Sequence, residues 1–384
     1  MAPTVYDVIV VGAGIEGSAT AHYLVNRGKH TLLLEQFPLP HSRGSSHGQS
    51  RVIRKAYTDY FYSNMMHEAT QMWLELQNSF GVKLYKQSGY LSIGDSGGKF
   101  LTEIADSMSR AKASYQMLTK SEFKASYPMM KYPSTFTGVL DHDGGILRAD
   151  KALQAFQSEF TRHGGELIDG CRVTRIIPGS TVTVKTPNAT FRGQKVIVTA
   201  GPWTSSVMNP LGLHLPLKPT RINVYYWKEL ECGSHSAGKF RPFVEVKCCE
   251  PHYVYGLPSD EYPGHVKICF SYGPEIDPEN RDSVDDSWCL GVMKKYIRDH
   301  FPGLDASSPS IVESCIITNT PDKHPILDKH PRWENIVVGA GFSGHGFKLS
   351  PVIGKLLGQM ALREAPAYDV TRFRIDRFQT SSKL

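Results

Sequence analysis

The first 35 residues contain, one after another, the patterns of a strand, a glycine-rich turn, a helix and a second strand. Residues 7–11 (DVIVV) are a continuous apolar run, which is typical of a strand buried on both faces of a parallel sheet. The turn GAGIEG follows directly, apolar residues then recur at helical spacing as far as Arg27, and residues 31–34 (TLLL) lead into Glu35. This order predicts a β-α-β unit that binds a dinucleotide at the turn.

Each part of this unit has a physical role in binding a dinucleotide. Gly12 permits the tight turn, Gly14 lets the backbone approach a pyrophosphate, and Gly17 lets the helix pack closely against the strand. The helix N-terminus then faces the phosphates, and Glu35, 18 residues after Gly17, accepts hydrogen bonds from the ribose. The cofactor-binding positions predicted here are Gly12, Ala13, Gly14, Ile15, Glu16, Gly17 and Glu35. The turn alone does not choose between NAD and FAD.

Two later segments carry the same signal of a buried parallel strand. Residues 196–203 (VIVTAGPW) and 336–341 (IVVGAG) each join an apolar run to a turn of small residues. Because such signals occur early, midway and late, the nucleotide-binding domain is expected to be discontinuous. We assign residues 1–85, 146–215 and 320–384 to it, and residues 86–145 and 216–319 to a substrate domain. The predicted fold is α/β, with a Rossmann-like domain and a second α+β domain that contains a large mixed or antiparallel sheet. In that second domain, the alternating segment RINVYY (221–226) predicts a strand.

Composition narrows the class of protein. The 43 Lys and Arg against 37 Asp and Glu give a net charge of +6, spread along the chain without a basic block, so nucleic acid is not an expected partner. No apolar run is long enough to span a membrane, and the N-terminus lacks the features of a signal peptide, so we expect a soluble protein that is not secreted. Seven cysteines without a CxxC pair indicate reduced thiols, and we expect no metal site.

The sequence ends in Ser382-Lys383-Leu384. This tripeptide at a C-terminus is the address that the peroxisomal import receptor reads. We therefore expect a peroxisomal location, with the import receptor as a partner.

Three further stretches carry a family resemblance. They are HSRGSSHGQSRVIRKAY at 41–57, VESCIITNTPD at 312–322 and GAGFSGHGFK at 339–348. With the N-terminal turn and the SKL ending, they closely resemble the monomeric sarcosine oxidase family of flavoenzymes, over essentially the whole chain. The resemblance implies a monomeric two-domain FAD protein that oxidises secondary amino acids such as sarcosine or L-pipecolate, with oxygen as acceptor and hydrogen peroxide as product.

The same resemblance implies how the flavin is held. In this family the flavin is attached through its 8α-methyl carbon to a cysteine that aligns with Cys315. From the residues alone, Cys315 would be interpreted as a small buried hydrophobe. The resemblance also adds Val173, Gly344 and Lys348 to the cofactor-binding positions.

The resemblance assigns the catalytic positions as well. Arg54 and Lys348 align with residues that bind the substrate carboxylate, and Lys267 with a lysine near flavin N5 that is associated with oxygen activation. Arg51 and His47 align with residues that contact the flavin, where positive charge and hydrogen bonds would stabilise its reduced anionic form. Considered without the family, Arg54 could instead be a surface ion-pair partner and Lys267 an outward-facing residue of a half-exposed strand.

Two further expectations concern the pocket wall and a helix. Tyr57 and Tyr255 are candidates for the wall, and Ser350 and Pro351 have the order of an N-cap and first helical residue.

The chain departs from the family at two positions, with Ile317 where a tyrosine and Ser271 where a histidine are common. Losing two polar aromatic groups changes the size of the pocket and its recognition of the amine. An oxidase of another N-alkyl or glycated amino acid, a flavin dehydrogenase with a protein acceptor, and a redox-silent FAD-binding scaffold remain alternatives.

Overall fold

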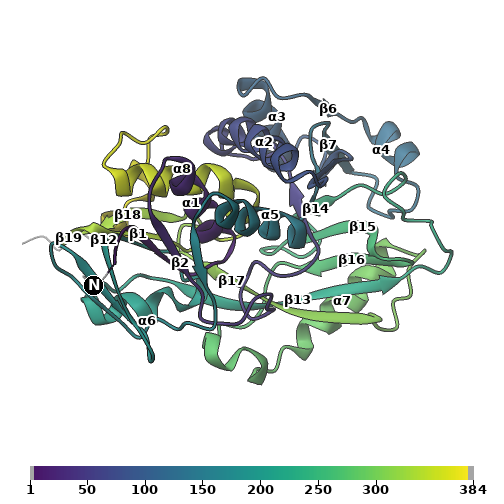
Figure 1. Ribbon diagram of the computed structural model, residues 1–384. Coiled ribbons are helices and arrows are strands. Elements are labelled where there is room, and N and C mark those ends of the chain that lie inside the picture. Colours follow the sequence, from purple (N-terminus) through teal and green to yellow (C-terminus); the bar gives the residue numbers. More distant parts are fainter. Residues whose placement is uncertain (1–3, 379–384) are drawn as a thin grey trace, which may run out of the picture.

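A computed structural model describes residues 4–378, which include two large sheets that lie side by side (Figure 1). The first sheet has the order β10-β11-β12-β1-β2-β9, with β19 paired to β12 and β18 paired to β19. Its strands are β1 (Val5–Val11), β2 (Thr31–Leu34), β9 (Glu166–Ile168), β10 (Arg175–Ile177), β11 (Val182–Lys185), β12 (Thr190–Val198), β18 (Ile326–His330) and β19 (Trp333–Ala340). The central strands β9, β2, β1, β12 and β19 are parallel, as the apolar runs predicted.

Helices cover one face of this sheet. They are α1 (Ile15–Asn26), α2 (Tyr60–Phe80), α5 (Ala149–Arg162) and α8 (Gly346–Leu362). Alternate residues of β1 point to opposite faces, so Val8 and Val10 join the cluster under these helices, whereas Ile9 and Val11 join the cluster on the other face, next to the short helix α6 (Thr204–Met208). Both faces are therefore apolar, which is why the strand pattern is continuous.

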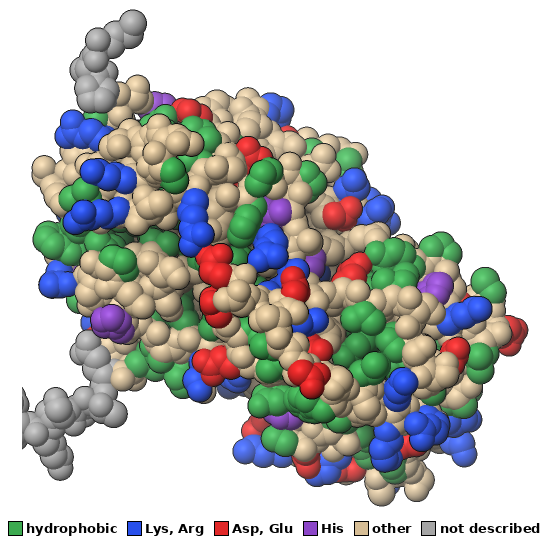
Figure 2. Space-filling view, turned by 90° about the horizontal axis from the view of Figure 1, so that it is seen from below, with side chains coloured by type: hydrophobic (Ala, Val, Ile, Leu, Met, Phe, Trp, Pro, Cys, Tyr) green, Lys and Arg blue, Asp and Glu red, His purple; other side chains and the backbone are tan. Residues whose placement is uncertain are grey.

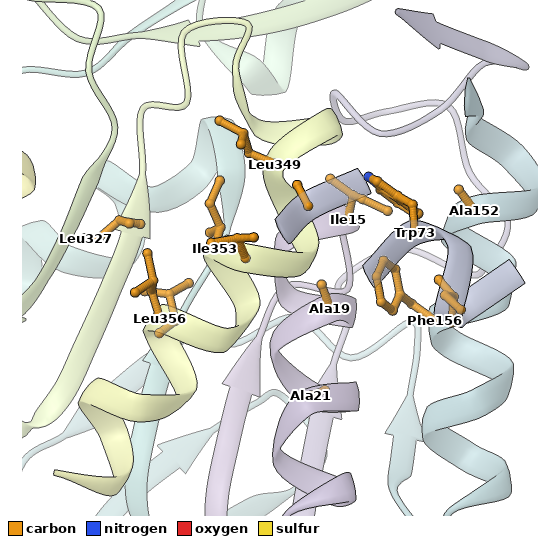
Figure 3. Close-up of a cluster of buried hydrophobic side chains, with 14 of the residues drawn as sticks. Ile15, Ala19, Ala21, Trp73, Ala152, Phe156, Leu327, Leu349, Ile353 and Leu356 are labelled. Atoms are coloured by element: carbon orange, nitrogen blue, oxygen red, sulfur yellow. The ribbon is translucent and has the colours of Figure 1, made fainter. Parts of the chain in front are cut away.

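Helix α1 is packed between α8 and α5, and α2 contacts both of those helices (Figure 3). Small residues allow this. A Cβ atom at Gly354 of α8 would lie only 2.6 Å from the backbone carbon of Ala19, so the two helices cross at nearly direct backbone contact. Trp73 of α2 and Phe156 of α5 fill the space on the opposite side of α1.

The second sheet has the order β17-β13-β16-β15-β14-β5-β7-β6. Its strands are β5 (Tyr90–Asp95), β6 (Tyr115–Met117), β7 (Phe136–Asp141), β13 (Lys218–Lys228), β14 (Phe243–Glu245), β15 (Val254–Tyr262), β16 (His265–Phe270) and β17 (Ile311–Asn319). All pairs are antiparallel except β14 with β5, so the sheet is mixed and the predicted fold class is confirmed. The accompanying helices are α3 (Lys99–Arg110), α4 (Lys120–Ser126) and α7 (Ser287–His300).

The strand expected at 221–226 is confirmed as part of β13, and both of its faces are covered. Tyr225 and Trp227 point into a cluster that includes residues of α7, and Val224 and Tyr226 point into a second cluster that includes Cys315. The alternation in the sequence therefore marks two different buried environments.

A small third sheet connects the two large ones. It consists of β3 (Ser50–Ile53), β8 (Gly145–Arg148) and β4 (Tyr85–Gln87). The described part of the chain also has 3₁₀ helices at Gly201–Trp203, Asn209–Leu211, Pro278–Ser283, Thr371–Phe373 and Ile375–Phe378. The strands of the two large sheets fall within the two sets of segments assigned above to the two domains; the domain limits themselves stay a prediction.

Helix α8 corrects the expectation for Ser350 and Pro351. The helix begins at Gly346, with His345 as N-cap, and Pro351 lies inside it. Gly341 and Gly344 adopt positive φ angles of 63° and 86°, so the chain reverses after β19 early enough for the helix to start five residues sooner. As a result Lys348 belongs to the first helical turn.

On the face seen in Figure 2, basic and acidic side chains are interspersed over both parts of the molecule. Within residues 4–378, no helix is long and apolar enough to cross a membrane. The terminal Ser382-Lys383-Leu384 lies outside the described residues.

Candidate functional site

The glycine turn after β1 is so tightly packed that two of its positions exclude any side chain. Gly12 has a φ of 103°, and a Cβ atom there would lie 2.5 Å from the carbonyl oxygen of Thr199. A Cβ atom at Gly17 would lie 1.8 Å from the carbonyl oxygen of Gly12. At Gly14 the nearest atom would be Oγ of Ser46 at 3.2 Å, so this position is less restricted.

Two side chains accept hydrogen bonds from backbone N–H groups of this turn. The N–H of Ala13 donates to Oε2 of Glu35 at 2.9 Å, and the N–H of Ile15, the first residue of α1, donates to Oγ of Ser46 at 2.9 Å. Glu35 is buried and stands directly after β2. A helix N-terminus, a glycine turn and an acidic residue therefore meet at the carboxyl ends of parallel strands, and this set fits the dinucleotide that the sequence predicts. Val173 is partly buried against the apolar cluster on the side of this sheet away from α1.

Glu16 is partly buried between the first turns of two helices. It belongs to the first turn of α1, and its Oε1 would lie 2.1 Å from a Cβ atom at Gly346, where α8 begins. Two helix N-termini favour a carboxylate, as does Arg51 nearby, but the loss of hydration outweighs them and raises the pKa of Glu16 to about 7.

Arg51 of β3 connects the loop after residue 41 with Cys315. Its guanidinium donates to the carbonyl oxygens of Ser45 at 2.9 Å and His47 at 2.6 Å. The thiol of Cys315, on β17, lies 4.0 Å from the same Ser45 oxygen. The Arg51 guanidinium and the Cys315 thiol therefore approach the same carbonyl oxygen, and the thiol is only partly buried. Both features suit a reactive cysteine.

His47 contributes a hydrogen-bonding group and no charge. Burial, together with Arg51, Arg281 and His41, lowers the pKa of His47 to about 4, so the imidazole is neutral at neutral pH. Its Nε2 atom is buried and has no hydrogen-bond partner within residues 4–378. A buried polar atom without a partner is costly, so this nitrogen fits a bound polar group.

Arg54 and Lys348 converge on the ring of Tyr57 from two different elements. The guanidinium carbon of Arg54 lies 4.0 Å from the ring centroid, and Nζ of Lys348 lies 5.8 Å from it. Arg54 also faces the ring of Tyr90 at 5.4 Å, and Nζ of Lys348 donates to the carbonyl oxygen of Gly344 at 2.9 Å. Among the described residues, neither cation forms an ion pair with a carboxylate.

This arrangement leaves positive charge uncompensated in a poorly hydrated place. Burial, followed by the repulsion of Arg54 and Arg51, holds the pKa of Lys348 well below its usual range. His345, the residue before α8, stacks on Tyr57 and Tyr62, and burial together with Lys348 and Arg54 lowers its pKa as well. The site is therefore one that an anion would stabilise.

Lys267 of β16 is separate from these cations. Its side chain is 6% exposed, so it does not face outward, and its Nζ donates to Oε1 of Glu261 at 2.8 Å and to Oγ of Ser50 at 3.2 Å. Ser50 immediately precedes Arg51 on β3, so the hydrogen bond from Lys267 joins the second sheet to the segment that carries Arg51.

Several residues at this site were not identified from the sequence. Tyr253 and Tyr90 surround Arg54, and Glu261 pairs with Lys267. Tyr90 and Tyr253 are far from Arg54 in the sequence, and no motif marks Glu261. The sequence therefore did not indicate these contacts. Ser271 accepts a hydrogen bond at its Oγ from the N–H of Tyr253 at 3.0 Å, and Ile317 is a partly buried residue of β17. The chosen cofactor and catalytic residues stay predictions as far as their roles are concerned.

Comparisons with known proteins show the family to which the chain belongs. A family description of FAD dependent oxidoreductases (DAO) matches residues 7–360. The peroxisomal sarcosine oxidase of Homo sapiens is 45% identical over 98% of this chain and 97% of its own, and the monomeric sarcosine oxidase of Bacillus sp. (strain NS-129) is 31% identical over 97% of each chain. The solved structure of NikD, an unusual amino acid oxidase essential for nikkomycin biosynthesis, is 25% identical, with a TM-score of 0.83 over 97% of each chain.

The raised pKa of Glu16 predicts a pH-dependent stability difference. Folding raises the pKa from 4.5 to about 7, so the folded protein prefers the neutral carboxyl, and wild type loses stability as pH rises through this window. At pH 8, Glu16→Gln should therefore unfold at a higher urea concentration than wild type, and its free energy of unfolding should be greater by up to roughly 3 kcal/mol. This difference should shrink toward pH 4.5. The exposed Glu75→Gln in α2 is the matched control. Parallel pH profiles for Glu16→Gln and wild type would contradict this account.

Proposed function

Because the chain belongs to the family of FAD dependent oxidoreductases, we propose that it oxidises a small secondary amino acid, sarcosine or L-pipecolate, with oxygen as electron acceptor. One observation carries the choice of an amino acid as substrate. Arg54 and Lys348 present two cations, with no carboxylate partner among residues 4–378, beside the aromatic surface of Tyr57. The names of the relatives, sarcosine oxidases of bacteria and of animal peroxisomes, support the same substrate class.

A substrate carboxylate would offset the repulsion between these two cations. Arg54 can accept it with two parallel hydrogen bonds, while Lys348 supplies a point charge. Two contacts from different elements define the orientation of the bound molecule as well as its position, and orientation is a large part of catalysis. The rings of Tyr57 and Tyr90 then face the carbon chain of the substrate.

FAD, when bound, accepts the hydride from the carbon next to the substrate nitrogen. The residues of this chain orient that carbon through the carboxylate and reduce the access of water to it. Arg51 and the neutral His47 supply a positive charge and a free hydrogen-bonding nitrogen in the flavin-binding segment. Oxidation of sarcosine followed by hydrolysis of the imine gives glycine and formaldehyde, whereas pipecolate gives a cyclic imine. Lys267 places a buried ammonium for the reduction of oxygen, in which negative charge develops.

We propose that Cys315 forms the covalent bond to the flavin. In support, its thiol is partly buried, lies on the strand that faces the Ser45 loop, and shares the Ser45 carbonyl with the guanidinium of Arg51. Such a bond requires the thiolate form of a cysteine.

A second substrate class is favoured by the entrance of the site. Tyr253, beside Arg54, is 40% exposed, and the family tyrosine and histidine are replaced by Ile317 and Ser271. A larger N-alkyl or glycated amino acid would bind its carboxylate to the same two cations, in a substrate pocket with more space. A dehydrogenase that passes electrons to a protein acceptor differs from the oxidase in releasing no peroxide.

The peroxisome is the proposed location. The terminal Ser382-Lys383-Leu384 is of the type that the import receptor binds, and two similar proteins are named peroxisomal. Peroxisomal catalase would remove the hydrogen peroxide that the reaction forms.

The carboxylate proposal predicts the behaviour of Arg54→Met. Under anaerobic conditions sarcosine or L-pipecolate should bleach the flavin band of wild type, and the faster one is the preferred substrate. Arg54→Met should need at least about 100-fold more substrate for the same rate, because it removes a charged hydrogen bond in a buried place. Arg110→Met removes an arginine that stacks on Tyr60 at 4.3 Å and should change nothing. If neither compound bleaches a fully loaded flavin, this substrate assignment is wrong.

The covalent bond predicts that acid-precipitated wild type stays yellow. Cys315→Ser should release its flavin into the supernatant, because the hydroxyl cannot form the thioether. Cys269→Ser, at a fully buried thiol on β16 of the same sheet, serves as control and should keep the colour in the pellet. A colourless wild-type pellet would contradict the bond.

The terminal tripeptide predicts the location of a fluorescent fusion. A fusion that ends in residues 382–384 should colocalise with catalase in cultured animal cells, and one that lacks them should stay in the cytosol, since the receptor reads this sequence. Equal distributions of the two fusions would exclude this address.

A further inference from the structure

Behind Lys267 lies a chain of hydrogen bonds that the proposed reaction does not yet use. We call Lys267, Ser50, Glu261, Tyr226, Glu313 and Tyr262 the Glu261 network. Nζ of Lys267 donates to Oε1 of Glu261 at 2.8 Å, and Ser50 Oγ contacts the same oxygen. The other carboxylate oxygen, Oε2, accepts from the hydroxyl of Tyr226 at 2.8 Å. Glu261 therefore bridges a lysine and a tyrosine with its two oxygens.

The chain continues from Tyr226 toward the surface. The Tyr226 hydroxyl lies 3.2 Å from Oε2 of Glu313, and the hydroxyl of Tyr262 donates to Oε1 of Glu313 at 2.7 Å. Lys267, Tyr226 and the Glu261 carboxylate are buried, whereas Glu313 and Tyr262 are partly exposed. The network thus joins the buried ammonium to solvent without a gap.

The tyrosine in the middle has too few hydrogens for its contacts. Tyr226 carries one hydroxyl hydrogen, but oxygens of two different glutamates lie within hydrogen-bond distance of it. Both contacts are hydrogen bonds only when one of the two carboxyls itself carries a proton. The same heavy-atom positions therefore accommodate more than one distribution of protons, as a proton relay requires.

The reaction needs such a relay, provided that the proposed oxidase function is right. Hydrogen peroxide forms from oxygen, two electrons and two protons. The hydride from the substrate supplies both electrons and one proton, so the second proton must arrive separately (H⁻ + O₂ + H⁺ → H₂O₂). Hydrolysis of the iminium product returns one proton to solvent, and the balance closes over a full cycle.

We propose that the Glu261 network carries this second proton from solvent to Nζ of Lys267. The ammonium gives one proton to the reduced oxygen, and Glu261 then protonates the amine that remains. Glu261 regains a proton from solvent through Glu313 and Tyr226. Glu261 is a positioning residue that acts through Lys267. It receives the proton at Oε2, the oxygen that faces Tyr226, so its carboxyl must rotate to bring that oxygen to Lys267 before the proton is returned.

The electrostatics of Glu261 suit this order of events. Burial is the largest influence on its pKa and acts to raise it, but the charge of Lys267 and the hydrogen bonds of Lys267, Ser50 and Tyr226 hold the pKa below its usual value. When Lys267 gives up its proton, this charge disappears and burial dominates. Glu261 then attracts a proton at the moment when Lys267 needs one.

The kinetic test uses protein reduced with stoichiometric dithionite, so that it does not depend on any substrate. Wild type and variants are mixed with oxygen in water and in heavy water. Glu261→Gln should reoxidise about 100-fold more slowly than wild type, since the amide accepts from Lys267 but cannot pass a proton. Asp260→Asn makes the same carboxyl-to-amide change one residue away, in an exposed ion pair with Lys86, and should reoxidise like wild type.

Tyr226→Phe separates a relay from simple positioning of Lys267. This change keeps the bond between Lys267 and Glu261 but breaks the path to Glu313. We expect slow reoxidation with an enlarged solvent isotope effect. Normal reoxidation of Tyr226→Phe would overturn the relay. Failure of sarcosine and pipecolate to bleach the flavin would overturn the proposed substrates alone, because dithionite reduction still reports on the network.

A static measurement tests the network without any turnover. Infrared spectra at neutral pH should show the band of a protonated carboxyl in Lys267→Met that is absent from Lys267→Met/Glu261→Gln. Wild type and Glu261→Gln should not differ in this band, because the charge of Lys267 keeps Glu261 ionised. If Glu261 stays ionised in Lys267→Met, the relay has no proton to return and the proposal is wrong. Should Glu261→Gln fail to fold, reoxidation of Tyr226→Phe and the infrared comparison of Lys267→Met with wild type still test the relay.

Discussion

The distance between the first turn of α1 and the strands beneath it is the constraint on which the rest of the structure depends. At Gly17 even one added carbon would overlap the carbonyl of Gly12. Because α1 lies so close to the sheet, the turn at its N-terminus contacts Glu35. Helix α8 can also cross α1 at Gly354 with the two backbones nearly in contact. The start of α8, which carries Lys348, is thereby brought to the start of α1. One close approach thus determines both the nucleotide site and the cation site.

The cations of the site are stabilised without carboxylates. Arg51 is bound by backbone carbonyls, Arg54 lies against aromatic rings, and Lys348 donates to the carbonyl of Gly344. Carbonyl dipoles and ring faces lower the cost of burying a cation but leave its charge available. A carboxylate at the same place would neutralise the charge and compete with an anionic substrate. The choice of neutral partners is therefore what makes these residues suited to binding.

Local sequence patterns predicted the β-α-β unit correctly. They failed where contacts beyond the local sequence determine the structure. The second strand, Thr31–Leu34, and the parallel order of the central strands follow from apolar runs bounded by glycines. The start of α8 was misjudged because Pro351 resembles a first helical residue, although the glycines before it had already turned the chain. The pairing of Lys267 with Glu261 leaves no trace in spacing, since it depends on where the turn between β15 and β16 folds.

The two buried lysines show how the same side chain takes different roles. Lys267 has a carboxylate partner within the protein, Glu261. Lys348 has only a backbone carbonyl and two cations nearby, and its pKa is lowered as a result. An anion beside Lys348 would raise that pKa again, so substrate binding and protonation of Lys348 favour each other. Lys267 is therefore suited to a step in which charge must already be in place, and Lys348 to one in which the charge arrives with the substrate.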